Sequence, residues 1–498
     1  MRYLVTSAEM KQYDKATIER IGIPGPVLME RAALQTFAVL KERGCVIPYK
    51  KALILAGVGN NGGDGLVLAR LLCEANLEVY VWVVGDEAKA TDDFKLQKKI
   101  LGSFPVQFVS VPSEKAYDIV VDALFGVGLS RPLEGKYKEA IERLNQMTGT
   151  KLAMDVPSGV SSDTGEILGA SFDADLTVTY GFEKKGLYLY PGTTKTGEVI
   201  LADVGIGWRA IGENLPGTFA MEGSIEELLL KRDPNGNKGT FGKALILAGS
   251  YNMAGAALLC TKACYRTGAG MVKLLTAPEN RVIVQDSLPE ALLGNIEEEK
   301  DLQESLAWCD AVCIGPGLGK TDATKHALES VLDAKKPLII DADGINMLSE
   351  DQKLLEVLKM QGQAGRQILL TPHAGEFLRL WNGFYKDVLS MQEFKKSPWD
   401  YAKRLAEELS VIIIAKDART FICAPTHPVC MNLSGNSGMA TAGSGDVLAG
   451  ILTAFVAAKT SEDVFSKACK AVRVHGLLGD AAAKRMGEHA VMASELIP

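Results

Sequence analysis

The sequence predicts an α/β protein of two domains, each built around a mainly parallel sheet. An apolar heptapeptide, KALILAG, occurs at Lys51–Gly57 and again at Lys243–Gly249, and each copy runs into a loop of small residues and then a helix. Short, continuously apolar strands that alternate with helices are typical of buried parallel sheets. A chain of 498 residues also exceeds one ordinary hydrophobic core. We expect the domain boundary in the loosely patterned, Gly- and Pro-containing stretch 205–223.

The composition is that of a globular protein without an electrostatic signature for nucleic acid. The chain is 47% hydrophobic and 23% charged, with a net charge of −7. Its nine cysteines form no CxxC pair and have no metal-ligand spacing, so we expect buried free thiols in a reducing compartment, the cytoplasm. The start of the chain lacks an apolar signal core, and the apolar run Val447–Ala458 is too short to cross a bilayer. Neither nucleic acid nor a membrane is an expected partner.

The first half opens with residues 7–43, which predict two helices, broken at Ile23–Pro26, with no assigned chemistry. Next, Lys51–Gly57 predicts a strand, and the glycine loop Gly57–Gly65 (GVGNNGGDG) leads into a predicted helix at Leu66–Ala75. The loop satisfies GxGxxG, and Asp86 follows the next predicted strand, as the ribose-binding acid of a dinucleotide site does. The loop's Asn and Asp residues are more polar than a pyrophosphate loop needs, which indicates direct contact with a substrate or a cation.

Two further predicted strands of this half end in acids. Ile119–Leu124 contains Asp122, and Lys151–Val156 contains Asp155. Because ligands bind at the carboxyl edge of an open parallel sheet, these acids are expected to converge with the polar residues of the glycine loop. The alternative is that each acid caps its own turn. The loop Gly181–Pro191 carries Lys184 and Lys185; we interpret it as a solvated charged loop rather than a phosphate contact.

Polar residues also follow the predicted strands of the second half. The strand ends lead to GPGLGK, DADG, TPHAGE and KDART, and His373 lies within TPHAGE. Such a histidine is either a ligand contact or a satisfied structural residue. The five cysteines of the apolar segments are expected to serve packing. The predicted strands of the second half are Met271–Thr276, Ala311–Ile314, Pro337–Ile340, Gln367–Leu370, Val411–Ala415 and Thr420–Cys423. One more strand, Glu198–Val204, is predicted at the end of the first half.

The segment Thr441–Gly450 (TAGSGDVLAG) carries the clearest chemistry of the chain. Small residues let the backbone approach a ligand, and a helix that starts near Asp446 aims its free N–H groups at an anion. Asp446 could then take a proton from a hydroxyl while the amides hold a transferring phosphoryl group. The alternative is a Gly-rich turn in which Asp446 only caps the helix. The chain contains no Walker GxxxxGK[ST] motif, so phosphate binding is assigned to this segment and to Lys416–Thr420.

Taken together, these motifs resemble the bifunctional NAD(P)H-hydrate repair enzymes. The resemblance extends over nearly the whole chain and implies a Rossmann-like three-layer α/β/α epimerase domain over residues 1–212 and a ribokinase-like α/β/α dehydratase domain over residues 223–498. The motifs that carry it are GNNGGDG (59–65), FGVGLSRP (125–132), MDVPSG (154–159), KGTFGKALILAGS (238–250), GAA (255–257), GPGLG (315–319), DADG (341–344), TPHAGEF (371–377) and TAGSGDVLAG (441–450).

For the epimerase domain, the resemblance implies exchange between the R and S hydrates of NADH and NADPH. Asp155 is expected to be the acid/base, and a K⁺ ion is expected on Asn61, Asp122 and Ser158. The implied substrate contacts are Asn60, Asn61, Gly62, Gly63, Asp64, Gly126, Val127, Gly128, Leu129, Ser130, Arg131, Pro132 and Asp155.

For the dehydratase domain, the resemblance implies that Asp446 deprotonates the ring hydroxyl of the S hydrate as ADP or ATP phosphorylates it, after which phosphate leaves. Mg²⁺ is expected for charge neutralisation. Substrate contacts are expected at Ala256, Gly317, His373 and Asp446, and nucleotide contacts at Lys416, Asp417, Ala418, Arg419, Thr420 and Gly445.

Two alternatives remain beside this interpretation. One is a ribokinase-like kinase for a vitamin or sugar, although many such kinases carry Asn-x-x-Glu where this chain has His373-Ala-Gly-Glu376. The other takes the first domain as a binding module without activity, as in RNA-associated scaffold proteins, against which Asp155 and the acidic charge argue. The expected partners are small molecules, and a homo-oligomer is expected.

Overall fold

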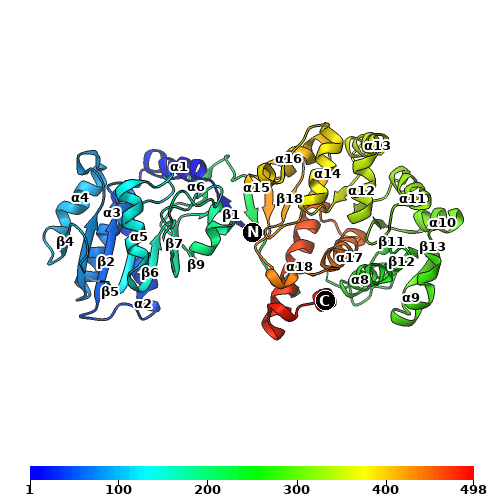
Figure 1. The fold of residues 1–498 in the computed structure, drawn as a ribbon, viewed down its shortest axis with the longest axis horizontal. Coiled ribbons are helices and arrows are strands. Elements are labelled where there is room, and N and C mark those ends of the chain that lie inside the picture. The colour runs from blue at the N-terminus through cyan, green and yellow to red at the C-terminus, as the bar shows by residue number, and fades with distance from the viewer. Residues whose placement is uncertain (114, 230) are drawn as a thin grey trace. The chain divides into compact units, whose positions relative to one another are not determined.

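The computed structural model describes residues 1–113, 115–229 and 231–498, and these divide into two compact units. Residues Tyr3–Thr218 form the first unit, and Phe219–Pro498 together with Met1–Arg2 form the second. Each unit contains a largely parallel sheet flanked by helices (Figure 1). The predicted α/β fold class is confirmed.

The sheet of the first unit has the strand order β4-β3-β2-β5-β6-β7-β9, and all of its pairings are parallel. The heptapeptide strand β2 lies between β3 and β5, which explains why its side chains from Ala52 onward are all buried. A separate short strand, β1, pairs in parallel with β8, with Val5 opposite Lys184. The bounds are β1 Arg2–Val5, β2 Lys51–Ala56, β3 Glu78–Val83, β4 Gln107–Val109, β5 Ala116–Ala123, β6 Thr148–Met154, β7 Leu176–Tyr180, β8 Glu183–Lys184 and β9 Glu198–Ala202.

Side chains alternate between the two faces of this sheet, and each face carries its own core. Ile54 of β2 belongs to the core that also holds Leu68 of α3, whereas its neighbour Leu53 belongs to the core that holds Leu144 of α5. The sheet is therefore the middle of three layers, as the resemblance predicted. The helices are α1 Ser7–Lys15, a π-helical turn Ala16–Ile21, α2 Gly25–Glu42, α3 Asn60–Glu74, α4 Asp92–Leu101, α5 Gly135–Asn145 and α6 Trp208–Ile211.

The glycine loop is shorter than predicted, because α3 begins at Asn60 rather than at Leu66. Three of its glycines lie inside the helix. A Cβ on Gly62 would lie 1.8 Å from the carbonyl oxygen of Gly57, and one on Gly65 would lie 2.6 Å from Cβ of Ala123. The glycines therefore serve close packing of the helix on the sheet, not loop flexibility.

The sheet of the second unit has the order β13-β12-β11-β14-β15-β16-β17-β18-β19. Its pairings are parallel from β13 to β17 and antiparallel from β17 to β19. The second KALILAG segment forms β11 in the interior of this sheet, as β2 does in the first. The bounds are β10 Thr218–Ala220, β11 Lys243–Leu247, β12 Met271–Thr276, β13 Leu292–Asn295, β14 Ala311–Ile314, β15 Leu338–Ile340, β16 Ile368–Leu370, β17 Ile412–Ala415, β18 Phe421–Cys423 and β19 Val429–Met431.

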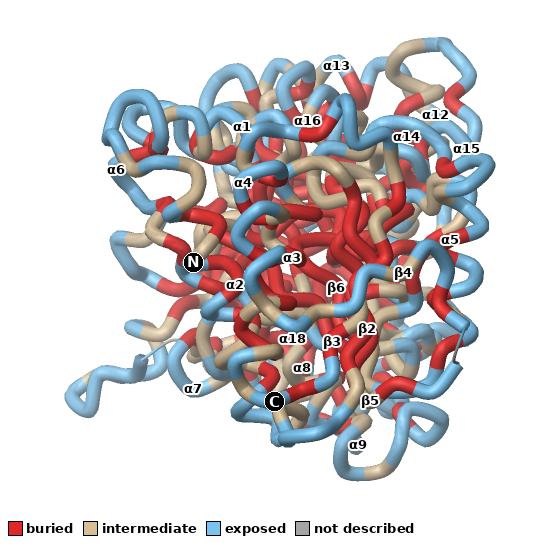
Figure 2. Tube along the Cα trace, turned by 90° about the vertical axis from the view of Figure 1, so that its left-hand side faces the viewer, coloured by how far each residue is buried: buried red, intermediate tan, exposed pale blue. Residues whose placement is uncertain are grey.

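Helix α17, which follows the GSGD segment, is buried on all sides from Val447 to Ala457. It packs against α8, α18 and β14, so its continuous apolar sequence reflects burial within the unit. Figure 2 shows exposed residues on the outer helices and loops around the buried strands. The helices are α7 Ile225–Leu228, α8 Ala254–Arg266, α9 Arg281–Ser287, α10 Glu299–Trp308, α11 Asp322–Asp333, α12 Ala342–Glu350, α13 Gln352–Gln363, α14 Ala374–Tyr385, α15 Met391–Lys396, α16 Pro398–Leu409, α17 Ser444–Ala457 and α18 Val464–Met486.

All nine cysteines are free thiols, as expected, and the five of the apolar segments that we assigned to packing are buried. The expectation of burial was wrong for Cys45 and Cys73, which are partly exposed. Setting aside residues 114 and 230, no helix combines the length and the apolar character that crossing a membrane requires.

Gly62→Ala tests the close-packing role of the glycine segment. Because its Cβ would overlap a backbone oxygen, which no rotamer change can relieve, we expect a loss of about 3 kcal/mol or more in the free energy of unfolding of the first unit. Gly59→Ala is the matched control, since nothing lies within 4 Å of its Cβ position. Urea unfolding followed by circular dichroism measures both; equal stability of the two variants would contradict the packing account.

Candidate active sites

The first unit has a cavity of about 460 Å³ at the carboxyl edge of its sheet. The helices to which the sequence assigned no chemistry, α1 and α2, supply part of its wall, including Asp14 and Met29. The cavity brings together the predicted site residues Asn60, Asn61, Asp64, Gly126, Val127, Gly128 and Asp155. Among the described residues, Gly62, Gly63 and Leu129–Pro132 do not line it, and Asp86 instead caps a short 3₁₀ turn.

Asp155 is held by a buried ion pair with Lys184. The Lys184 side chain is 0% exposed, and its Nζ lies 2.5 Å from Oδ1 of Asp155. The same ammonium donates to Oγ1 of Thr179 at 3.0 Å and to the carbonyl oxygen of Tyr180 at 2.8 Å. All three of its protons are therefore used, which a buried charge requires.

The prediction of a solvated charged loop around Lys184 was wrong. Lys184 and Lys185 are both buried, because this segment forms β8, which pairs with β1, and then a 3₁₀ turn. Apolar and aromatic residues flank the two lysines in GFEKKGLYLYP, and this was the only sequence signal for their burial. Lys184 is the main site residue that sequence reasoning missed.

The backbone at Asp155 directs its carboxylate into the cavity. Asp155 has a left-handed conformation with φ of 67°, which aspartate tolerates better than most residues and which is typical of functional sites. Its Oδ2 accepts a hydrogen bond from the backbone N–H of Val127 at 3.3 Å. A Cβ on Gly126 would lie 2.9 Å from that oxygen, so glycine is needed where the two segments meet.

Asp122, Ser158 and Asn61 supply oxygen atoms of the kind that bind a monovalent cation. Asp122 is fully buried and accepts from the Ser158 N–H at 2.7 Å, from Ser158 Oγ at 2.7 Å and from the Leu124 N–H at 3.1 Å. Burial raises the pKa of Asp122 to about 6, and these hydrogen bonds oppose the rise. The amide oxygen and nitrogen of Asn61 are both buried without a partner among the described residues, which leaves an oxygen that a cation would satisfy.

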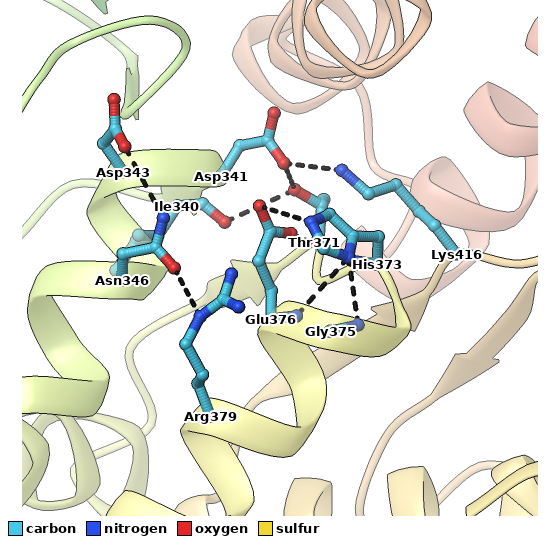
Figure 3. A network of polar contacts seen from close by, with 10 residues as sticks. All are labelled: Ile340, Asp341, Asp343, Asn346, Thr371, His373, Gly375, Glu376, Arg379 and Lys416. Carbon is cyan, nitrogen blue, oxygen red and sulfur yellow. Dashed lines mark hydrogen bonds and ion pairs between the residues drawn. The ribbon is translucent and has the colours of Figure 1, made fainter. Parts of the chain in front are cut away.

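In the second unit, residues that follow three strands, β15, β16 and β17, meet in one polar network (Figure 3). Asp341, which follows β15, is buried; its Oδ1 accepts from Lys416 Nζ at 2.8 Å and from Thr371 Oγ1 at 2.6 Å. Burial opposes the charge of Lys416, but the carboxylates of Asp341 and Glu376 outweigh it and raise the lysine's pKa. The strand-end motifs DADG, TPHAGE and KDART therefore converge, as predicted from the sheet edge.

The GSGD segment meets this network at the start of α17. Gly443 has φ of 91°, and the helix begins at Ser444, whose N–H donates to the Thr441 carbonyl oxygen at 3.3 Å. The N–H groups of Gly445 and Asp446 make no such bond to the described residues and can meet an anion. A Cβ on Gly445 would lie 3.3 Å from Lys416 Nζ, which places that ammonium at the helix N-terminus. Burial, then the nearby charge of Asp341, raises the pKa of Asp446 to about 6, while Lys416 partly offsets the rise.

His373 caps α14 through its ring. Nδ1 accepts from the N–H groups of Gly375 at 3.0 Å and Glu376 at 3.4 Å, so the ring proton lies on Nε2, which is 3.3 Å from Glu376 Oε1. The side chain is 55% exposed. Both ring nitrogens are thus engaged within the protein, and His373 offers a ligand its ring face.

The other predicted contacts of this unit lie as follows. Ala256 and Gly317 are neighbours, because a Cβ on Gly317, at φ of 54°, would lie 2.7 Å from the Ala256 Cβ. Asp417 and Ala418 are exposed, while Arg419 and Thr420 are partly buried in front of β18. The motifs DADG and TPHAGE were recognised in the sequence, but no role was predicted for Asp341 or Glu376. The carboxylates of these two residues raise the pKa of Lys416.

Comparisons with known proteins match the two halves of the chain, each of which carries one of these sites, to two different family models. The sequence model of the NAD(P)H-hydrate dehydratase family matches residues 244–498, and that of the YjeF-related protein N-terminus matches residues 25–186. A bifunctional NAD(P)H-hydrate repair enzyme from Thermofilum pendens is 35% identical over 98% of this chain and 94% of its own. The chain belongs to the bifunctional NAD(P)H-hydrate repair family.

Other members of the family match along the same length. The enzymes of that name from Coxiella burnetii and Escherichia coli are 32% and 31% identical, over 100% and 98% of this chain and 98% and 91% of theirs. Among solved structures, an ADP/ATP-dependent NAD(P)H-hydrate dehydratase from Bacillus subtilis, crystallised with ATP/Mg²⁺, is 30% identical. It covers 55% of this chain and 93% of its own, with a TM-score of 0.46. The resemblance drawn from the sequence motifs is thereby confirmed at the level of the family.

Lys184→Met tests the buried pair of the first site. Loss of the ammonium leaves the Asp155 carboxylate without its counter-charge, so we expect the free energy of unfolding to fall by about 3 kcal/mol. Lys184→Met combined with Asp155→Asn removes both charges and should recover at least half of that loss. Urea titration measures each variant; a double variant no more stable than the single one would show that the pairing is not the source of the loss.

Proposed function

We propose that the protein repairs hydrated NADH and NADPH, with the first unit exchanging the R and S hydrates and the second dehydrating the S hydrate. The observation that carries the proposal is the presence, in one chain of this family, of two separate sites with distinct chemistry. One is an aspartate cavity built for proton transfer, and the other is a helix N-terminus with a lysine and an acid built for phosphoryl transfer.

In the dehydratase site, Asp446 takes the proton of the ring hydroxyl as the hydroxyl oxygen attacks the terminal phosphorus of ADP or ATP. Lys416 and the free N–H groups of α17 stabilise the negative charge on the transferring group. The ring C–O bond then breaks with its electron pair on the phosphate. Loss of a proton from the neighbouring ring carbon restores the double bond, so the product is NADH or NADPH, phosphate and the shortened nucleotide.

The nucleotide is assigned to Gly445 and to Lys416, Asp417, Ala418, Arg419 and Thr420, and the hydrate to Ala256, Gly317, His373 and Asp446. Support comes from their position around the N-terminus of α17 and from the exposed ring of His373. Mg²⁺ would neutralise phosphate charge there. In the described residues no three His, Cys, Asp or Glu side chains form a metal cage, and this suits an ion that phosphate oxygens and water hold for the most part.

In the epimerase site, Asp155 is proposed as the acid/base, because its carboxylate faces the cavity from a fixed backbone and a fixed ion pair. The K⁺ ion is proposed on Asn61, Asp122 and Ser158, and the orphaned amide of Asn61 supports it. The cation would supply positive charge near the substrate. The substrate is assigned to residues 60–64 and 126–132 and to Asp155, of which Asn60, Asn61, Asp64, Gly126, Val127, Gly128 and Asp155 line the cavity.

The alternative of a vitamin or sugar kinase is not favoured, because relatives with repair activity in their names match both halves of the chain. A binding module without activity would not need the buried Asp155–Lys184 pair. A cytoplasmic location and a homo-oligomer remain parts of the proposal, and the nine free thiols support the former.

Single substitutions should separate the two activities. Asp446→Asn is expected to lower ADP-dependent recovery of NADH from its S hydrate at least about 100-fold, because the base is lost, and to leave epimer exchange unchanged. Asp155→Asn should do the reverse. Absorbance of reduced nicotinamide follows the first activity and chromatography of the two hydrates the second. The wild-type protein tested with ADP, ATP and a vitamin panel is the control; phosphorylation of a vitamin without NADH recovery would support the kinase instead.

The pH profile of the dehydratase step should report Asp446. With a raised pKa of about 6, the base is protonated below that pH, so kcat/KM should fall about tenfold per pH unit on the acid side. Lys416 lowers this pKa, so Lys416→Met should move the acid limb of the residual activity to higher pH. A limb that stays in place in this variant would contradict the assignment of the limb to Asp446.

A further inference from the structure

The cavity of the first unit holds a second carboxyl group that the role of Asp155 leaves unused. Asp64 lies in the first turns of α3 and lines the same cavity as Asp155. Its carboxyl makes no hydrogen bond to the residues that the structure describes, whereas Asp155 is bound by Lys184, Thr179 and the Val127 N–H. One carboxylate is thus fixed and charge-paired, and the other is free to meet a ligand.

The groups that face Asp64 favour its protonated form. Burial and then the charges of Asp155, Asp14 and Asp93 raise the pKa of Asp64 well above its ordinary value, and Lys184 only partly opposes them. The cavity wall also includes Tyr180 and Lys11. With more carboxylates than cations in one enclosed space, a proton on Asp64 relieves the repulsion.

No other inward-facing group offers that proton as readily. The Tyr180 hydroxyl is buried and paired with Oγ1 of Thr36 at 2.8 Å, and burial raises its pKa well above the ordinary value. The three protons of Lys184 are committed to Asp155, Thr179 and Tyr180. Asp14 also lines the cavity with a raised pKa, but only the pKa of Asp64 is raised well above the ordinary carboxyl value, so Asp64 is the better proton donor.

The second unit repeats the arrangement. There, the buried Asp341 is paired with the partly buried Lys416, and burial and the Asp341 charge raise the pKa of Asp446. In the first unit Asp155 and Lys184 form the pair, and Asp64 lines the same cavity as both. The two sites share a lysine–aspartate pair that keeps one charge fixed beside a second acid that can change its protonation.

We infer that Asp64 is the proton donor that works with Asp155 in epimerisation, an inference that rests on the proposed function of the first unit. Asp155 takes the hydroxyl proton of the hydrated carbon, whose C–O bond becomes a carbonyl as the bond from that carbon to the ring nitrogen breaks. The electron pair goes to the nitrogen, which receives the proton of Asp64. Closure on the opposite face of the carbonyl reverses both transfers, so each carboxyl regains its starting state and no oxidant or reductant is needed.

Asp64→Asn in the full-length chain is the test, with exchange between the R and S hydrates of NADH followed by chromatography in the absence of ADP. We expect kcat to fall at least about 100-fold with KM within about threefold, because the amide keeps the shape but has no acidic proton. Asp64→Glu should regain at least a tenth of the wild-type rate. Asp92→Asn is the matched control, since that carboxylate is 102% exposed on α4, and it should stay within about twofold of wild type.

The pH profile and the second activity separate the possible outcomes. In wild type and Asp64→Glu, kcat/KM should fall on the alkaline side as the acid loses its proton, and this limb should be absent from Asp64→Asn. A circular dichroism spectrum and a urea unfolding midpoint of the first unit that match wild type show that each variant is folded, and unchanged dehydratase activity shows that the second site is intact. Exchange within threefold of wild type in Asp64→Asn, a retained alkaline limb in that variant, or no such limb in Asp64→Glu would overturn the inference. Failure of the wild-type protein to exchange the epimers would instead overturn the proposed function.

Discussion

In each unit a lysine pairs with a buried aspartate at the carboxyl edge of a parallel sheet, and the proposed chemistry of both sites depends on this ion pair. Lys184 holds Asp155 at 2.5 Å, and Lys416 holds Asp341 at 2.8 Å. Removal of two charges from water costs several kcal/mol per ion, so each pair persists only because further hydrogen bonds complete its environment. Burial and the charge of the paired carboxylate together raise the pKa of the nearby acid, Asp64 or Asp446, and the lysine partly opposes the rise.

The same physical arrangement can serve two reactions because the surroundings differ. In the first unit the acids line a cavity of about 460 Å³, and proton exchange is all that epimerisation requires. In the second unit the acid lies in the first turn of a helix whose N-terminal N–H groups attract an anion, which suits its proposed role of activating a hydroxyl for attack on a phosphoryl group. Function therefore depends on what lies beside the lysine pair, not on the α/β fold that both units share.

The sequence predicted the sheets well and the polar interior less well. Apolar runs such as KALILAG are strands because a central parallel strand is buried on both faces, and this pattern is local. Strand-end acids could be placed at a common edge for the same reason. The burial of Lys184, by contrast, depends on the pairing of β8 with β1, whose residues lie far away in the chain, and no local pattern records it. Likewise, the glycines of 59–65 indicated a loop by composition, whereas α3 begins at Asn60. Gly62 lies inside this helix because it packs against the carbonyl oxygen of Gly57, a contact that composition does not show.

Two sites that act in series on one ligand should work when they are supplied on different chains. The direct measurement mixes equal amounts of the Asp155→Asn and Asp446→Asn proteins with the R hydrate of NADH, ADP and Mg²⁺, and follows the absorbance of reduced nicotinamide. The account predicts that the mixture restores NADH nearly completely, whereas Asp155→Asn alone restores only what spontaneous epimerisation allows and Asp446→Asn alone restores almost none. A mixture no better than the better single variant would contradict the assignment of epimerisation to Asp155 and dehydration to Asp446.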